Sequence, residues 1–240
     1  MKRFLVWAFI VAVTSAGSSV RADDANAVIE KAIKAMGGRE KLEKIHATEV
    51  KTKGLLNLDG NETPITAQAI SEGVDHYRLQ FEGDFGGNKI KAITVVNGNK
   101  GWRKFGDEVT KLNERSLRGE KRMMYLQQVV GNPTLFGHKG FKVLKADQSA
   151  VTATGPDGNE FTVYYDKETG LPAKLVAKVI GFTGEEVKQE TTYSDFKDFG
   201  EIKKATKAES KRDGEPFLKQ EIIEFKVLDK VDPKTFDEPK

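Results

Sequence analysis

The chain has 240 residues, no cysteine and a formal net charge of +3. The absence of cysteine excludes disulfide bonds, thiolate metal sites, cysteine nucleophiles and a lipid-modified N-terminal cysteine. Lys2, Arg3 and Arg21 are the only charged residues within residues 1–22, and removing them from the 39 basic residues leaves 36, which balances the 36 acidic residues. Nucleic-acid-binding proteins usually carry a basic excess or a basic stripe, so the composition argues against nucleic acid as a partner.

Residues 1–22 have the pattern of a cleavable signal peptide. Lys2 and Arg3 precede an uncharged apolar run over residues 4–13, and the segment ends in Val20-Arg21-Ala22. We expect signal peptidase to cut after Ala22. The apolar run is shorter than the roughly 20 residues that span a bilayer, although an N-terminal membrane anchor is the alternative. Residues 23–240 are therefore expected to form an exported, soluble protein that is periplasmic or secreted and is not an integral membrane protein.

Two segments, residues 24–36 and 113–130, carry apolar residues at three- and four-residue spacing, which predicts two amphipathic helices. Gly37-Gly38 ends the first helix, because glycine adopts the left-handed conformation that follows a helix without steric cost. A short helical turn is expected over residues 39–45. Residues 131–137 have the composition of a turn-rich loop.

Elsewhere the apolar period is two, which predicts β-strands. The predicted strands are residues 46–57, 63–71, 75–82, 89–96, 101–111, 141–147, 150–154, 160–166, 171–180, 187–196, 201–211 and 216–229. Four of the connections contain pairs that favour tight hairpins, namely Asp59-Gly60, Asn97-Gly98, Asp157-Gly158 and Asp213-Gly214. Successive hairpins predict an antiparallel meander. No Pro- or Ser-rich linker divides residues 23–240, so we expect a single domain.

One face of each predicted strand is apolar, as the alternation of Tyr77, Leu79 and Phe81 illustrates. The same rule groups Phe161, Val163 and Tyr165; Leu171, Ala173, Leu175, Ala177 and Val179; and Ile223, Phe225 and Val227. A single open sheet of this size must curl. We therefore expect a mainly β (α+β) fold, in which a curved antiparallel sheet has its concave face covered by the two helices. Helices and sheet either make a filled core or enclose a ligand cavity.

No motif for catalysis or metal binding is present in the sequence, which lacks a Gly-x-Ser-x-Gly elbow, a P-loop and a His-Glu-x-x-His sequence. His46, His76 and His138 fall in three separate segments, and each is more typical of a surface histidine than of a ligand. The carboxylates fall mostly on turns and solvated faces, so no pair of them marks an acid–base site. We predict no catalytic residue, no metal site and no cofactor.

Three stretches resemble a known group of exported bacterial proteins. They are residues 35–45 (AMGGREKLEKI), 193–203 (YSDFKDFGEIK) and 231–239 (VDPKTFDEP). With the signal peptide and the hairpin-rich body, they look like the carriers that sort lipoproteins to the outer membrane, the LolA/LolB-like superfamily. The resemblance implies an incomplete β-barrel, a helical lid and a hydrophobic cavity that accepts acyl chains. The sequence departs from that pattern at Lys204-Ala205, where a proline is expected.

The functional hypothesis is a carrier or binding protein for a lipid or lipoprotein acyl chain, held between the sheet and the helices. The candidate wall residues are Tyr77, Leu79, Phe81, Phe161, Val163, Tyr165 and Leu175, and the candidate cover residues are Met123, Leu126 and Phe136. Methionine suits such a cover because its side chain adapts to varied partners. The alternative is an exported structural or interaction domain with a filled core, no lipid ligand and an envelope protein as its partner. An enzyme is the least favoured class.

Overall fold

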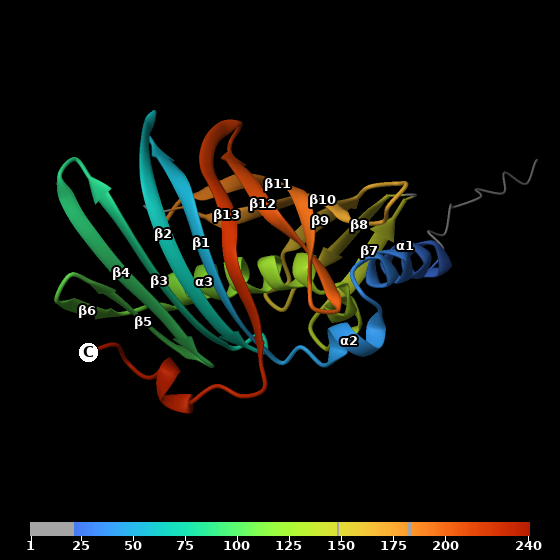
Figure 1. Cartoon of the computed structure of the whole chain (residues 1–240), viewed down its shortest axis with the longest axis horizontal. Helices are drawn as coiled ribbons and strands as arrows, with labels where there is room; N and C mark the ends of the chain where they lie inside the picture. The colour runs from blue at the N-terminus through green and yellow to red at the C-terminus, as the bar shows by residue number, and fades with distance from the viewer. Residues whose placement is uncertain (1–21, 148, 182–183) are drawn as a thin grey trace, which may run out of the picture.

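The computed structural model describes residues 22–147, 149–181 and 184–240 (Figure 1). The predicted signal peptide lies outside these residues, apart from Ala22. The helical elements are α1 (Ala22–Ala35), α2 (Arg39–Glu43) and α3 (Glu114–Gly131), with the short 3₁₀-helices η1 (Pro133–Gly137) and η2 (Pro233–Phe236). All remaining regular structure in the described residues is β-strand.

The strands form one antiparallel sheet, which has 13 strands in the described part of the chain. They are β1 (Ala47–Leu58), β2 (Asn61–Glu72), β3 (His76–Phe85), β4 (Asn88–Asn97), β5 (Lys100–Phe105), β6 (Glu108–Lys111), β7 (Lys142–Ala146), β8 (Ala150–Thr154), β9 (Glu160–Tyr165), β10 (Pro172–Ile180), β11 (Glu186–Phe199), β12 (Ile202–Arg212) and β13 (Glu215–Leu228). The strand order is β6-β5-β4-β3-β2-β1-β13-β12-β11-β10-β9-β8-β7. Two meanders, β1–β6 and β7–β13, are thus joined by the β1–β13 pairing, and β6 and β7 stay at the two edges. The sheet is curved but does not close, which confirms the expected incomplete barrel.

Local sequence signals set the element boundaries. Helix α3 begins where the apolar period predicts, because the Asn113 side chain caps it by accepting a hydrogen bond from the Ser116 backbone N–H at 2.9 Å. The Asp59-Gly60 hairpin has positive φ at both residues, 52° and 82°. One predicted strand, residues 101–111, is two strands, because Gly106 has φ 59° and turns the chain between β5 and β6.

A β-bulge changes which residues of β13 face the concave side. Lys51 of β1 pairs with Glu224, but the next residue of β1, Thr52, pairs with Ile222, so Ile223 is left without a partner. Ile223 and Val227 are exposed at 56% and 46%. The prediction that Ile223 shares an apolar face with Phe225 is therefore wrong, since alternation with period two fails across a bulge. Val227 pairs with Thr48 in the same register in which Phe225 pairs with Val50, so it keeps the face of Phe225 but is exposed near the end of the strand.

The main core lies at the β7–β10 end of the sheet. It joins buried side chains of α1, α3 and η1 to the concave face, and includes Ile29, Ile33, Leu126, Val129, Phe136, Val151, Phe161, Val163, Leu175 and Val179. Both long helices therefore cover the concave face, as expected. Figure 1 shows α1 beside β7 and β8, whereas α3 runs across the sheet towards β4 and β5.

Candidate binding cavity

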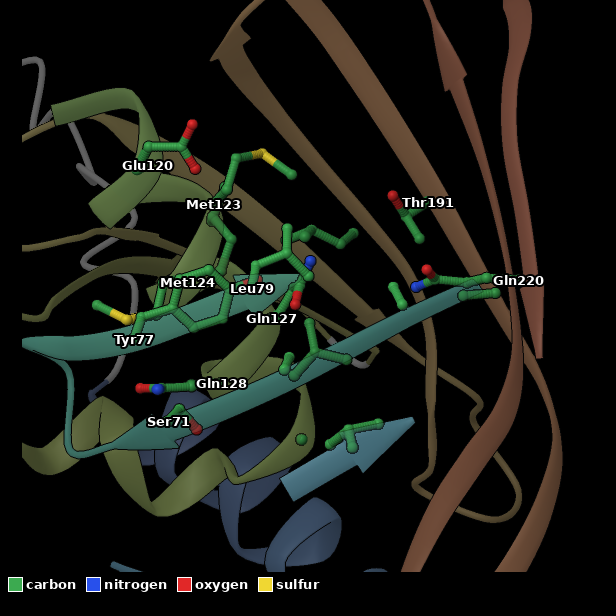
Figure 2. A pocket seen from close by; sticks show the side chains of 18 of the residues that line it. Ser71, Tyr77, Leu79, Glu120, Met123, Met124, Gln127, Gln128, Thr191 and Gln220 are labelled. Atoms are coloured by element: carbon green, nitrogen blue, oxygen red, sulfur yellow. The ribbon is translucent and has the colours of Figure 1, made fainter. Parts of the chain in front are cut away.

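A cavity of about 1550 Å³ lies between helix α3 and the concave face of the sheet (Figure 2). Its wall is formed by inward-facing residues of β1–β4 and β10–β13, and its cover by one side of α3. Cavities that bind small molecules commonly measure about 300–1,000 Å³. This cavity is larger, so the helix and the sheet do not fill the space between them.

Small side chains keep the space open. The inward-facing residues of β2 include Ala67, Ala69 and Ser71, and β4 and β12 contribute Ala92 and Ala208. In the filled half of the sheet, the corresponding wall carries large side chains. A packed protein interior has few voids larger than a water molecule, because large side chains fill the space between its elements. Alanine side chains are too short to reach α3, so the space between them and the helix stays open.

The wall on the β1–β3 side is mainly apolar, and Thr48 and Thr52 are the polar residues that β1 adds to it. Val50 pairs with Phe225 on one side and with Ala69 on the other, and Ala69 pairs with Leu79, so these side chains form one row across four strands. Leu56 lies six residues beyond Val50 on β1 and also lines the cavity. At about 3.4 Å per residue, the wall from Val50 to Leu56 extends for about 20 Å.

Helix α3 presents Met123, Leu126, Gln127 and Val130 to the cavity. Figure 2 shows Met123 and Gln127 near Leu79, with Thr191 and Gln220 across the hollow. Gly119 lets the helix approach β10, because a Cβ at this position would lie 3.2 Å from the Cβ of Ile180. A glycine, which weakens the helix locally, thus relieves crowding at the contact between α3 and the sheet.

Arg122 fastens α3 to the β8–β10 part of the sheet. Its guanidinium forms an ion pair with Asp157 at 3.0 Å and donates hydrogen bonds to the carbonyl oxygens of Glu160 at 2.8 Å and Lys178. Tyr125, one turn along the helix, donates its hydroxyl proton to Asp157 at 2.7 Å. The Arg122 and Asp157 side chains are 5% and 13% exposed, so this cluster is largely withdrawn from water.

Ionisation in this cluster follows its contacts. Burial alone would raise the pKa of Asp157, but hydrogen bonds from Tyr125 and Asn159 and the charge of Arg122 outweigh burial and hold the pKa below its ordinary value. Burial, followed by the hydrogen bond to Asp157, raises the pKa of Tyr125 well above its usual range. The cluster is thus an arginine–carboxylate pair with a neutral tyrosine at neutral pH.

The other part of the sheet is held to α3 by a small buried cluster, in which Met124 packs with Tyr77 and Val96, and by surface contacts. Arg103 of β5 pairs with Glu120, and Lys121 pairs with Asp75 at 2.9 Å. Gln128 donates a hydrogen bond to the Gly73 carbonyl oxygen at 2.7 Å. Exposed ion pairs each contribute little, so the buried cluster around Met124 is the main contact of α3 with β3 and β4.

The structure divides the ten nominated residues into two groups. Six of them line the cavity: Tyr77, Leu79, Phe81, Met123, Leu126 and Leu175. Of these six, Leu126 and Leu175 also belong to the main core. The other four, Phe136, Phe161, Val163 and Tyr165, lie in the core and do not line the cavity. Phe161 is 2% exposed and its ring lies about 6.1 Å from those of Tyr125 and Phe136.

The polar side chains of the cavity were not predicted from the sequence. Thr191, Ser210 and Gln220 lie on the wall, and the hydroxyl groups of Thr191 and Ser210 are 2.9 Å apart. Lys204 also lines the cavity, and burial lowers the pKa of its ammonium group to about 8. Lys204 falls at the place where the sequence departs from the LolA/LolB-like pattern, which is the one sequence signal that singles it out.

Among the described residues, no three carboxylate or imidazole side chains come together in a way that suits a metal ion. Over the same residues, no helix is both long enough and apolar enough to cross a bilayer.

Comparison with known proteins shows the fold. No protein-family model matches the chain, and no curated protein matches its sequence. A LolA superfamily protein from Nitrosomonas europaea is similar in structure, with a TM-score of 0.56, 14% sequence identity, and 89% of this chain and 97% of that chain covered. A protein of the DUF1329 family from Desulfovibrio piger also gives a TM-score of 0.56, at 11% identity, with the same shares covered.

A third similar structure is a domain from Vibrio parahaemolyticus named for outer membrane lipoprotein sorting. It matches with a TM-score of 0.53 and 10% identity, over 90% of this chain and 97% of that chain. The protein therefore resembles the LolA superfamily and lipoprotein-sorting domains over most of its length, as expected from the sequence. At these identities the likeness shows the incomplete-barrel fold alone.

Proposed function

We propose that this protein is an exported carrier or binding protein for the acyl chain of a lipid or a lipoprotein. The observation that carries the proposal is the cavity of about 1550 Å³ between α3 and the alanine-rich concave wall. Burying a methylene group stabilises a complex by about 0.8 kcal/mol, so an apolar wall about 20 Å long favours a long hydrocarbon chain. The similar structure named for lipoprotein sorting supports the same class of ligand.

The alternative is an interaction domain with a filled core. The β7–β10 end of the sheet fits that description, because α1, α3 and η1 pack tightly against it. The β1–β4 side does not, since its wall faces the cavity. We favour the carrier for this reason, and we propose no catalytic activity.

Titration with a fluorescent fatty-acyl probe tests the proposal. Wild-type protein should bind the probe saturably, with micromolar affinity after the cost of ordering the chain. Phe81→Asp places a carboxylate in the cavity wall and should weaken binding by tenfold or more, because the charge loses water when the chain enters. Gln80→Asp, on the opposite face of β3, is the matched control and should bind like the wild type. Absence of saturable wild-type binding would favour the filled-core interaction domain.

A further inference from the structure

Lys204 lies at the end of the cavity where helix α3 terminates. Its ammonium nitrogen is 3.4 Å from the carbonyl oxygen of Gly131, the last residue of α3, and 4.8 Å from the ring centroid of Phe225. The wall beside it is the apolar row that continues from Phe225 to Val50 and Leu79. A charged group thus stands at one end of a long apolar surface.

Lys204 differs from the other cations that line the cavity. Arg103 pairs with Glu120, Lys207 pairs with Asp195 at 3.6 Å, Arg115 donates to the Gly184 carbonyl oxygen, and Arg212 donates to Gln189 at 3.1 Å. Within the described residues, no carboxylate lies within 4.0 Å of the Lys204 ammonium. Its only hydrogen bond to the protein in this part of the chain is the long one to Gly131.

An ammonium group has three donors, so a lysine with one long hydrogen bond retains donors for a ligand. Loss of water around the group lowers the pKa of Lys204 to about 8, which leaves it mostly protonated at neutral pH. Without a ligand, the charge is held in surroundings that disfavour it. An anion placed on Lys204 supplies the missing partner.

The number of cations on this face of β12 indicates which class of anion Lys204 binds. Arg212, the other cation on this face of β12, is eight residues away, a separation of about 27 Å along a strand. Phosphate recognition usually uses several donors or a bidentate arginine, whereas a single lysine matches a single negative charge. A carboxylate at the end of a hydrocarbon chain combines this charge with the apolar wall.

We propose that the cavity binds a long-chain fatty acid, with its carboxylate on the Lys204 ammonium group and its hydrocarbon chain along the β1–β3 wall. The inference rests on the proposed acyl-chain function and adds the chemistry of the headgroup.

The test compares dodecanoic acid, its methyl ester and dodecyl phosphate by calorimetric titration at neutral pH, below their aggregation limits. Wild-type protein should bind the acid at least tenfold more tightly than the ester, because a hydrogen bond to a charged group is strong when water is excluded. Lys204→Met should abolish this preference and leave binding of the ester intact. Lys203→Met is the matched control and should keep the preference. The Lys203 side chain pairs with Asp198 at 2.7 Å.

The possible outcomes separate the two proposals. Equal binding of acid and ester by the wild type would overturn the role of Lys204 and leave the acyl-chain function standing. Tighter binding of dodecyl phosphate than of the acid would overturn the carboxylate assignment. No binding of any of the three compounds would overturn the acyl-chain function itself. A preference for the acid that persists in Lys204→Met would place the anion elsewhere in the cavity.

Discussion

The guanidinium of Arg122 and the carboxylate of Asp157 meet at 3.0 Å in a largely buried ion pair that connects helix α3 to the turn between β8 and β9. The pair gains a third member in Tyr125, which donates a hydrogen bond to the same carboxylate. A buried pair of this kind specifies where two elements meet, since any other arrangement leaves a charge without its partner. It fixes one side of α3 against the filled end of the sheet, and another side of the helix covers the cavity.

Asp157→Asn should destabilise the protein by about 3 kcal/mol at pH 7, because it leaves the buried Arg122 without its counter-charge. In the wild type the folded-state pKa of Asp157 lies below its unfolded value. The unfolded chain therefore takes up the proton first as pH falls below about 4, and the stability from this group is lost on further acidification. Urea unfolding at several pH values should show this loss in the wild type and a smaller one in the variant. Asp198→Asn, at an exposed pair with Lys203, is the control and should change stability by less than about 0.5 kcal/mol.

Phe161→Ala and Phe81→Ala should differ in their effect on stability. Phe161 is 2% exposed in the filled core, so its truncation should lower the free energy of unfolding by about 3–5 kcal/mol. Phe81 is half-buried on the cavity wall, and few atoms pack against it from the cavity side. Its truncation should therefore lower the free energy of unfolding by less than about 2 kcal/mol. Chemical denaturation of both variants checks this difference. Equal losses would mean that the cavity is filled in solution.

Lys204→Met should stabilise the protein at pH 7 by about 1–3 kcal/mol, since it removes a charge that burial disfavours. The pKa of Lys204 is about 8 in the folded protein, against an ordinary value of 10.5. Between pH 8 and 10.5 the unfolded chain keeps a proton on Lys204 that the folded protein has released. The free energy of unfolding of the wild type therefore rises relative to that of Lys204→Met as the pH increases over this range. Thermal unfolding at pH 7 and pH 10 measures the difference, with Lys203→Met as the control. A loss of stability in Lys204→Met at pH 7 would contradict the expectation.

The affinity for a series of fatty acids should increase with chain length. Each added methylene group contributes at most about 0.8 kcal/mol, which corresponds to roughly a fourfold change in Kd. The increase should stop once the chain exceeds the wall of about 20 Å between Val50 and Leu56. Displacement of a fluorescent probe by acids of increasing length measures both the slope and the limit. An affinity that is independent of length would exclude the wall as the binding surface.

Export should remove residues 1–22. We expect the protein isolated from the periplasm or the medium of its host to begin at Asp23, because Val20-Arg21-Ala22 fits the cleavage site of signal peptidase. Intact-mass measurement distinguishes the cut chain from the uncut one. A mature form that retains residues 4–13 would favour the N-terminal membrane anchor.

Much of the fold follows from the sequence, because its signals act over a few residues. The Asp59-Gly60 pair predicts a hairpin wherever it lies, and Asn113 predicts the start of α3 because its side chain bonds to a backbone group three residues away. The bulge at Ile223 could not be predicted from the sequence. It depends on the register between β1 and β13, which are far apart in the sequence. Alternation alone cannot show where such a register shifts.

The lining of the cavity was predicted only in part, for the same reason. Tyr77, Leu79 and Phe81 alternate along their strand in the same way as Phe161, Val163 and Tyr165, and the sequence gives both sets an apolar face. Only the tertiary structure decides that the second set is covered by α1, α3 and η1, whereas the first faces a cavity. Likewise, the sequence predicts that Lys204 lies on a strand. Only the tertiary structure brings the Lys204 ammonium group to the cavity beside the end of α3. A strand determines which way its side chains point, but elements distant in the sequence determine whether that face is filled, empty or charged.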